Sequence, residues 1–290
     1  MSELDEVYNN YIENNEQYDK NKYIEYKRNE KKEVYELIDT TTEKVATSGD
    51  ELKKYLDSQS KFDGYSVGNA LLVSAQMPKA TQLRDVESWK NIGAYRKKFQ
   101  KPVKILEPGD QYMREDGSTG TNYNVKYVYD ITQVTPKQRQ RNMIYDNKIL
   151  LKVFLNSSMA GIQIVDNIPD TNKIAMYDQE KDVLYVKKGA EAPAIFHDVT
   201  EELAKQEVGE NSSLDSFKCK CVSYMLCKKY SVDVSNFDFS NIPQELKNME
   251  AKEIRQELEP IRDAMENINA RANAYIQKIM RENKNKENVR

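Results

Sequence analysis

The stretch "VESWKNIGAYRKKFQKPVKILEP", residues 86–108, is where helical patterning gives way to strands. Its first part predicts a short helix that ends near Gly93, because glycine favours the backbone conformations that close helices. Its end alternates apolar and polar residues as a strand does, and so does "NVKYVYDI" at 124–131. Because the turn-forming residues of "EDGSTGTN" lie between them at 115–122, the sequence predicts two strands of a small sheet.

Helices are predicted on both sides of this sheet. Apolar residues recur at helical spacing in three segments before it, at 34–45, 47–62 and 65–78. Together with the sheet they form an α+β unit predicted at residues 34–134. A second α+β unit is predicted at 135–245, where a hairpin pattern lies among helical segments. The predicted fold class is therefore α+β, with a helical N-terminal part and a small β-sheet, a second α+β domain and a long C-terminal helix.

The two ends of the chain differ in character. Residues 1–33 contain few aliphatic side chains and predict a polar arm that is loose or marginally helical. Residues 246–290 predict a C-terminal helix and tail, because apolar residues over 254–279 alternate four and three apart as in a heptad seam. Pro260 lies inside this pattern, so the helix either kinks there or begins there. The seam indicates either a helix that lies on the domain or self-association as a coiled coil.

Composition sets limits on the class of protein. Hydrophobic side chains make up 39% of the 290 residues and charged ones 31%, which is typical of a soluble protein. No apolar run of about 18 residues exists, so no membrane span is expected. The acidic, polar N-terminus lacks the pattern of a secretory signal. Because the cysteines are odd in number, at Cys219, Cys221 and Cys227, a reduced cytoplasmic setting is predicted.

Basic residues are concentrated rather than spread over the chain. The net charge is −3, and residues 34–134 carry fourteen basic and fourteen acidic side chains, so a nucleic-acid surface needs a local basic face. Residues 84–104 provide one, with seven basic side chains against two acidic ones, and aromatic residues interleave with the cations as single-strand binding requires. The alternative is structural, with the single tryptophan in the core and the lysines on a solvated face. The candidate DNA-binding residues here are Trp89, Lys90, Tyr95, Arg96, Lys97, Lys98, Lys101 and Lys104.

The stretch "IFHDVTEELAKQEV", residues 195–208, has the outline of the HExxH motif, in which two histidines hold zinc and the glutamate acts as general base. One alignment begins at His197, the only histidine of the chain, and places Glu201 at the second ligand position. The other runs from Glu201 to Lys205, keeps Glu202 as the base and replaces both histidines. A protonated lysine has no lone pair and repels a metal ion, so the second alignment predicts a vestigial site.

The cysteines lie in a predicted helix at 214–230. Residues two apart on a helix point about 200° apart, so Cys219 and Cys221 would not converge on a metal ion. We therefore interpret the cysteines as small core residues. A metal site that combines His197, Glu201 and one cysteine is the alternative.

Several of these segments, in this order, resemble the ArdC-type antirestriction proteins and the LtrC-like proteins of conjugative transposons. The resemblance extends over roughly residues 40–270, and "YNVKYVYDITQV" at 123–134 resembles the closing strand of the family's N-terminal domain. The stretch "VSYMLCKKYSVDVSNFDFSNIP" at 222–243 resembles a later helix and loop. The matching positions of the first domain are Tyr65, Ser66, Asn69, Leu71, Leu72, Gln76, Pro78, Ala80, Thr81 and Trp89.

The resemblance implies a protein in two parts. The family's first domain binds single-stranded DNA, which adds Tyr65 and Asn69 to the candidates for DNA binding. Its second domain is zincin-like, with HExxH on one helix and an acidic ligand on a later helix. Matching "ELAK" here to the family's "ELAH" selects the second alignment, so the vestigial motif is Glu201, Glu202 and Lys205. An ion pair between the first and last of these, four residues apart, would then merely stabilise the helix.

The later helix carries Lys218 and Lys220 near the place where relatives have the acidic ligand. The resemblance therefore implies a single-stranded DNA-binding protein of a mobile element, without a cofactor or catalysis, that shields incoming DNA from restriction. One alternative is a metal-dependent peptidase or nuclease with a site around His197, Asp198, Glu201 and Glu202. Another is a non-enzymatic adaptor that recruits a partner through the C-terminal seam.

Overall fold

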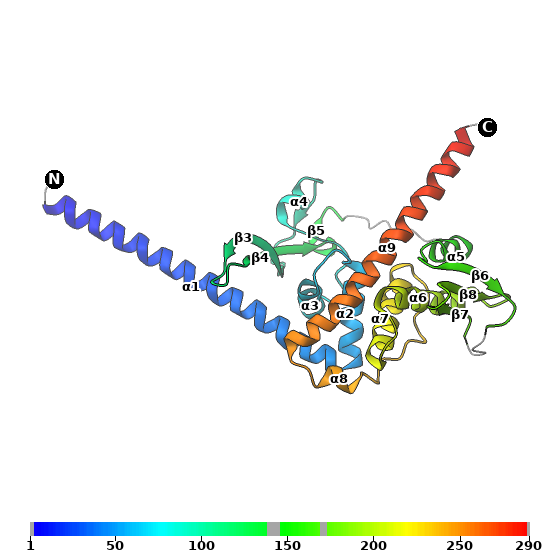
Figure 1. Ribbon diagram of the computed structural model, residues 1–290. Helices are drawn as coiled ribbons and strands as arrows, with labels where there is room; N and C mark the ends of the chain where they lie inside the picture. The colour runs from blue at the N-terminus through cyan, green and yellow to red at the C-terminus, as the bar shows by residue number, and fades with distance from the viewer. Residues whose placement is uncertain (1–2, 138–145, 169–172, 289–290) are drawn as a thin grey trace.

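The structure is a computed structural model of the chain, and Figure 1 shows it coloured from the N-terminus to the C-terminus. Two long helices at the ends of the chain project away from a body of shorter helices and small sheets. The structure describes the backbone of residues 3–137, 146–168 and 173–288, and their side chains except those of 3–18, 192–193 and 283–288.

The elements confirm the predicted α+β fold class. The helices are α1 (Glu3–Thr47), α2 (Gly49–Lys61), α3 (Val67–Gln76), α4 (Val86–Lys90), α5 (Asn147–Leu155), α6 (Ala192–Val208), α7 (Ser213–Lys229), α8 (Gln244–Lys247) and α9 (Ala251–Asn288), with a 3-10 turn at Ile131–Gln133. The strands are β1 (Leu83–Arg84), β2 (Tyr95–Arg96), β3 (Val103–Met113), β4 (Thr119–Asp130), β5 (Val134–Thr135), β6 (Gly161–Val165), β7 (Ala175–Asp178) and β8 (Val183–Lys187). Within the described parts of the chain, no helix is long and apolar enough to cross a membrane.

The antiparallel hairpin of β3 and β4 is longer than the sequence predicts. Half of the stretch that we predicted as a turn, 115–122, belongs to β4, which begins at Thr119. The turn closes within a few residues because the carboxylate of Asp116 accepts hydrogen bonds from the backbone and hydroxyl of Ser118, and Gly117 has a φ of 80°. The short strand β1 pairs with the other edge of β4, so the sheet order is β1-β4-β3.

Helix α3 is joined to the free edge of β3 by two side-chain amides. The amide of Asn69 donates to the carbonyl of Leu106 and accepts from its N–H, both at 2.8 Å. The amide of Gln76, two turns further along, pairs with both backbone groups of Lys104 at 2.8 and 2.9 Å. These amides replace the missing neighbouring strand, because an edge strand otherwise presents unpaired backbone groups. The predicted candidate Asn69 therefore has a structural role.

The carboxylate of Asp130 fixes the far end of the same sheet. Asp130 is fully buried and accepts hydrogen bonds from the backbone N–H groups of Thr81, Gln82 and Thr132 at 2.7 to 3.0 Å. It also accepts from the hydroxyl of Thr132 and caps the 3-10 turn, where Gln133 completes a capping box. Burial by itself would raise the pKa of Asp130, but these hydrogen bonds outweigh it and hold the pKa below its usual value.

The second part of the chain contains a three-stranded sheet of order β6-β8-β7, in which β6 is parallel and β7 antiparallel to β8. The hairpin of β7 and β8 confirms the predicted pattern at 174–189. Helices α6 and α7 pack against each other, and α6 also packs on β7. The division of the chain into units at 34–134 and 135–245 stays a prediction, and β5 spans this boundary.

The two end helices both pack on the body. Helix α1 runs without a break through residue 33, so the predicted polar arm is helical from Glu3 onward. Helix α9 also continues through Pro260, and the apolar seam from Ile254 to Ile276 is buried against helices of the same chain. The seam thus forms part of the core. Self-association through it would require these helices to separate, and it stays a prediction.

The lowered pKa of Asp130 predicts a specific dependence of stability on pH. A carboxyl whose pKa is lower in the folded state stabilises the fold above its unfolded pKa and loses this contribution as pH falls toward the folded pKa. In urea denaturation, the free energy of unfolding should therefore fall more steeply between about pH 5 and pH 3 in the wild type than in Asp130→Asn. Near pH 7 the variant should be less stable by about 1–3 kcal/mol. The exposed Asp110→Asn should behave as the wild type, and equal pH slopes for all three proteins would contradict this assignment.

Candidate functional site

The predicted basic cluster lies mainly on one exposed loop, residues 95–101, which we call the basic loop. It begins in β2, which pairs with β5, and leads into β3. The N–H of Lys97 donates to the carbonyl of Gln133 at 2.9 Å, and its ammonium donates to the carbonyl of Thr132 at 2.8 Å. These bonds hold the loop against the 3-10 turn. The exposed cations of the loop and of the adjacent helix α4 are Lys90, Arg96, Lys97, Lys98 and Lys101.

Two aromatic rings stand among these cations. Tyr95, a predicted candidate, is 56% exposed, and Phe99 is 98% exposed. Phe99 also has a φ of 61°, in the left-handed region where a bulky side chain is strained. Phe99 was not among the predicted DNA-binding residues. The sequence did contain a signal for it, because a lone phenylalanine lies between two lysines and the pair Gln100 and Lys101. An exposed, strained aromatic residue with cations on both sides is consistent with a stacking surface.

Trp89 corrects one prediction, because its ring is not offered to solvent. The side chain is 1% exposed, and its indole N–H donates to the carbonyl of Tyr129 at 2.8 Å. It packs in a small core with Ala94, Ile131 and Val134. Trp89 is therefore a core residue, which was the alternative interpretation of the sequence.

Three other candidates lie away from the basic loop. Lys104 points toward α1, where its ammonium is 3.2 Å from the buried carboxylate of Glu30. Asn69 is engaged with β3, and Tyr65 stacks on Phe62 with ring centroids 5.2 Å apart. Tyr65 and Asn69 instead line a cavity between the first part of the chain and α9. The structure thus brings together the cations of 90–101 and separates them from these three residues.

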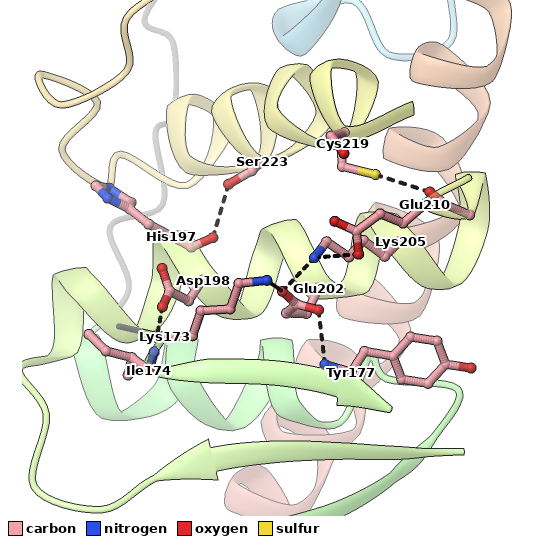
Figure 2. Close-up of polar contacts among 12 residues, drawn as sticks. Lys173, Ile174, Tyr177, His197, Asp198, Glu202, Lys205, Glu210, Cys219 and Ser223 are labelled. Carbon is pink, nitrogen blue, oxygen red and sulfur yellow. Dashed lines mark hydrogen bonds and ion pairs between the residues drawn. The ribbon is translucent and has the colours of Figure 1, made fainter. Parts of the chain in front are cut away.

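The second candidate site, on α6, is built around a buried ammonium group. Lys205 is 6% exposed, and its nitrogen lies 2.9 Å from a carboxylate oxygen of Glu202 and 2.8 Å from one of Glu210. Glu202 also accepts from the N–H of Tyr177 in β7 at 2.9 Å and lies 3.5 Å from the ammonium of Lys173. Figure 2 shows Glu202 and Lys173 between α6 and β7, and Glu210 nearer to Cys219 of α7. The predicted pair of Lys205 with Glu201 is not formed, because Glu202 and the loop residue Glu210 take its place.

Electrostatics keep Lys205 protonated. Burial by itself would lower the pKa of Lys205, but the hydrogen bonds and charges of Glu210 and Glu202 outweigh it and raise the pKa above its usual value. The neighbouring Glu201 has a raised pKa because it is buried, although the charge of Lys205 opposes this shift. Under the alignment that begins at Glu201, the position of the second histidine of HExxH would therefore hold a group that cannot donate an electron pair to a metal ion.

Helix α7 does not supply the two lysines predicted near the site. Lys218 pairs with Asp215 and with Glu257 of α9, and Lys220 lies over the ring of Phe239, 5.3 Å from its centroid. The residue of α7 that faces Lys205 is Cys219, whose thiol lies 3.6 Å from a carbonyl at the end of α6. Burial raises the pKa of Cys219 to about 12, so it is a neutral core thiol.

His197 does not join a metal-binding group either. Its Nε2 is 2.6 Å from the carbonyl of Asp233, and its ring meets Phe237 edge-on with centroids 5.0 Å apart. The carboxylate of Asp198 accepts from the N–H of Ile174. Among the residues that the structure describes, no three His, Cys, Asp or Glu side chains come together in a way that could hold a metal ion. Within the described residues, the alternative metal site at His197 and Glu201 thus lacks a group of three metal-binding side chains.

The fold is ArdC-like. It combines a helical first part and its small sheet with a second small sheet, a helix pair and a long final helix. The chain is similar to the crystal structures of the antirestriction ArdC protein from plasmid R388. The metal-free structure aligns with a TM-score of 0.50 and 13% identity over 72% of this chain and 86% of ArdC. The Mn(II)-bound structure aligns with a TM-score of 0.53 and 13% identity over 81% of this chain and 98% of ArdC.

At this identity the likeness shows the fold, and it confirms the ArdC-like resemblance at that level. No family model matches the chain. No curated protein matches it either.

The buried pair of Lys205 and Glu202 should contribute strongly to stability. Removal of one member of a buried ion pair leaves an uncompensated charge, so Lys205→Met should lower the free energy of unfolding by about 3 kcal/mol. A matched control is Lys54→Met, because Lys54 pairs with Glu51 at the same spacing on the surface and should cost about 0–1 kcal/mol. Urea denaturation at neutral pH measures both, and the double variant Glu202→Gln, Lys205→Met should regain part of the loss. Equal costs for the two lysines would contradict the structure.

Proposed function

We propose that the chain binds single-stranded DNA without sequence preference, through the basic loop and helix α4. The observation that carries this proposal is the exposed loop itself, which presents four cations together with the rings of Tyr95 and Phe99, next to Lys90 of α4. Cations follow a phosphate backbone, and rings stack on bases of any identity. Arg96 can contact a phosphate through two donors, whereas the lysines act as point charges. Trp89 and Lys104 are left out of this interface, since one is in the core and the other is paired with Glu30.

We further propose an antirestriction role for this binding, by analogy with the ArdC protein that shares the fold. Such a protein would protect incoming DNA of a mobile element in the cytoplasm, where the three buried thiols stay reduced. This proposal rests on the shared fold and on the basic loop together.

We propose no metal-dependent catalysis for the second part of the chain, which we interpret as a zincin-like domain without its active site. One ArdC structure binds Mn(II), but the donor set of this chain does not fit such an ion. Lys205 brings a positive charge where HExxH has a histidine, and Glu202, at the position of the general base, is occupied by two ammonium groups and a backbone N–H. A carboxylate held in this way is not free to take a proton from water.

Binding to oligo-dT should depend on salt and on the loop cations. If four or five cations contact phosphates, the logarithm of the association constant should fall with the logarithm of salt concentration with a slope of about −3. In fluorescence anisotropy titrations, the double variant Lys97→Glu, Lys98→Glu should weaken binding at low salt and give a slope nearer to zero. Replacement of the exposed Lys20 and Lys22 by Glu provides a charge-matched control on α1.

Phe99→Ala should act differently from the charge variants. It should weaken binding by about 1–3 kcal/mol for each stacked base at every salt concentration, with the slope unchanged. Tyr23→Ala, which removes a ring that is 62% exposed on α1, should leave binding as in the wild type. If the loop variants bind oligo-dT as tightly as the wild type does, the basic loop is not the interface.

A further inference from the structure

A cavity of about 460 Å³ lies between α1, α3, the β3–β4 hairpin and α9. Its volume falls within the range of about 300–1,000 Å³ that is typical of small-molecule sites. Because its walls come from both ends of the chain, it exists only when α9 is packed on the first part. It is separate from the basic loop and from the buried ion pairs of α6.

Three tyrosine rings from different elements line this cavity. Tyr35 of α1 and Tyr123 of β4 are each 39% exposed, and Tyr65 lies between α2 and α3 and is half-buried. Tyr35 and Tyr123 line the same cavity, and burial, with smaller effects from the hydroxyls of Tyr123 and Tyr112, raises the pKa of Tyr35. Rings held at a partly open cavity are suited to a flat aromatic ligand, since a second ring can stack on them or meet them edge-on.

The remaining walls favour a neutral ligand over a phosphate. Leu106 and Pro108 form an apolar wall from β3. The two charged residues at the cavity have opposite signs, and the guanidinium of Arg255 is already paired with Asp39 of α1. Glu259, the other charged residue, is exposed and can accept hydrogen bonds from an amine. A planar group with N–H donors on its edge, such as a nucleobase, fits this combination.

Strand β3 connects the cavity to the basic loop. Lys101, at the end of the loop, is five residues before Leu106, a distance of about 17 Å along an extended strand. A strand of DNA held at the basic loop can therefore reach the cavity within a few nucleotides.

We propose that this cavity takes an unstacked base of the single strand bound at the basic loop. The inference rests on the proposed function, since the loop supplies the contacts to phosphates and the cavity adds contacts to one base. The rings of Tyr35, Tyr65 and Tyr123 stack on the base, which makes the contact tolerant of sequence.

The test compares oligo-dT with an abasic tetrahydrofuran oligomer of the same length, because the two probes share a backbone and differ only in bases. In anisotropy titrations of the full chain, Tyr123→Ala should weaken binding of oligo-dT about tenfold and leave binding of the abasic oligomer unchanged. Tyr123→Phe keeps the ring and should bind both probes as the wild type does. Tyr185→Ala, which removes a half-buried tyrosine from β8, is the matched control.

A second variant blocks the cavity without removing a ring. A side chain at Gly64, which lines the cavity, would meet no atom within 4 Å of its Cβ, so Gly64→Trp should fill the space and reproduce the loss for oligo-dT. The inference is overturned if both variants bind oligo-dT as the wild type does, or if they weaken both probes equally. Lys97→Glu, Lys98→Glu should weaken both probes, which separates the loop from the cavity. If the wild type binds neither probe, the proposed function fails, and this inference fails with it.

Discussion

An ammonium group buried between two carboxylates determines what the second half of this chain can do. Lys205 lies on α6, Glu202 is one turn before it, and Glu210 follows the helix end, so the three groups also fix the exit of α6. Glu202 reaches the backbone of Tyr177, which ties the helix to β7. In the zincin-like interpretation that we propose, this ammonium group takes the place of the positive charge of a metal ion. It also stabilises the contact of helix and sheet.

The first half relies on hydrogen bonds from side chains to backbone groups where the second half uses ion pairs. Asn69 and Gln76 complete the free edge of β3, and Asp130 gathers three backbone N–H groups at the far end of the sheet. The two halves meet where α7 packs on α2, and there the hydroxyl of Tyr224 donates to Asp57 at 2.8 Å. With its edges satisfied in this way, the sheet can present the basic loop as an exposed feature on a fixed support. The exposed cations therefore belong to a loop that begins in the pair of β2 and β5 and leads into β3.

Regular elements were predictable because their signals are local. The three helices before the sheet, the hairpin of β7 and β8 and the helices α6 and α7 follow directly from apolar periodicity. The hypothesis that α6 carries a vestigial motif depends only on Glu201, Glu202 and Lys205 in their order, and it stays a prediction. The partners of Lys205 were not predictable, because Glu210 reaches it from a loop whose path depends on how α6 and α7 pack. Lys218 and Lys220 were placed near the site from their sequence position, but the rotation of α7 turns Cys219 toward α6 instead.

The DNA-binding candidates divide in the same way. The run of lysines was enough to predict a basic segment. Which aromatic residues are buried depends on tertiary packing, which places Trp89 in the core and leaves Phe99 exposed. Composition rules read an isolated phenylalanine as a core residue, and only its surroundings in the fold show otherwise. The structural role of Asn69 could not be predicted either, since its partner is 37 residues away on a strand edge.

The claim that the ammonium of Lys205 excludes a metal ion is tested most directly by calorimetric titration. The full chain, prepared without a histidine tag and dialysed against a chelator, would be titrated with Mn(II) and with Zn(II) at neutral pH. This account predicts no stoichiometric binding of either ion at micromolar concentrations. One-to-one binding that is abolished in Glu202→Gln would contradict it, because the ion would then share the site that Lys205 occupies.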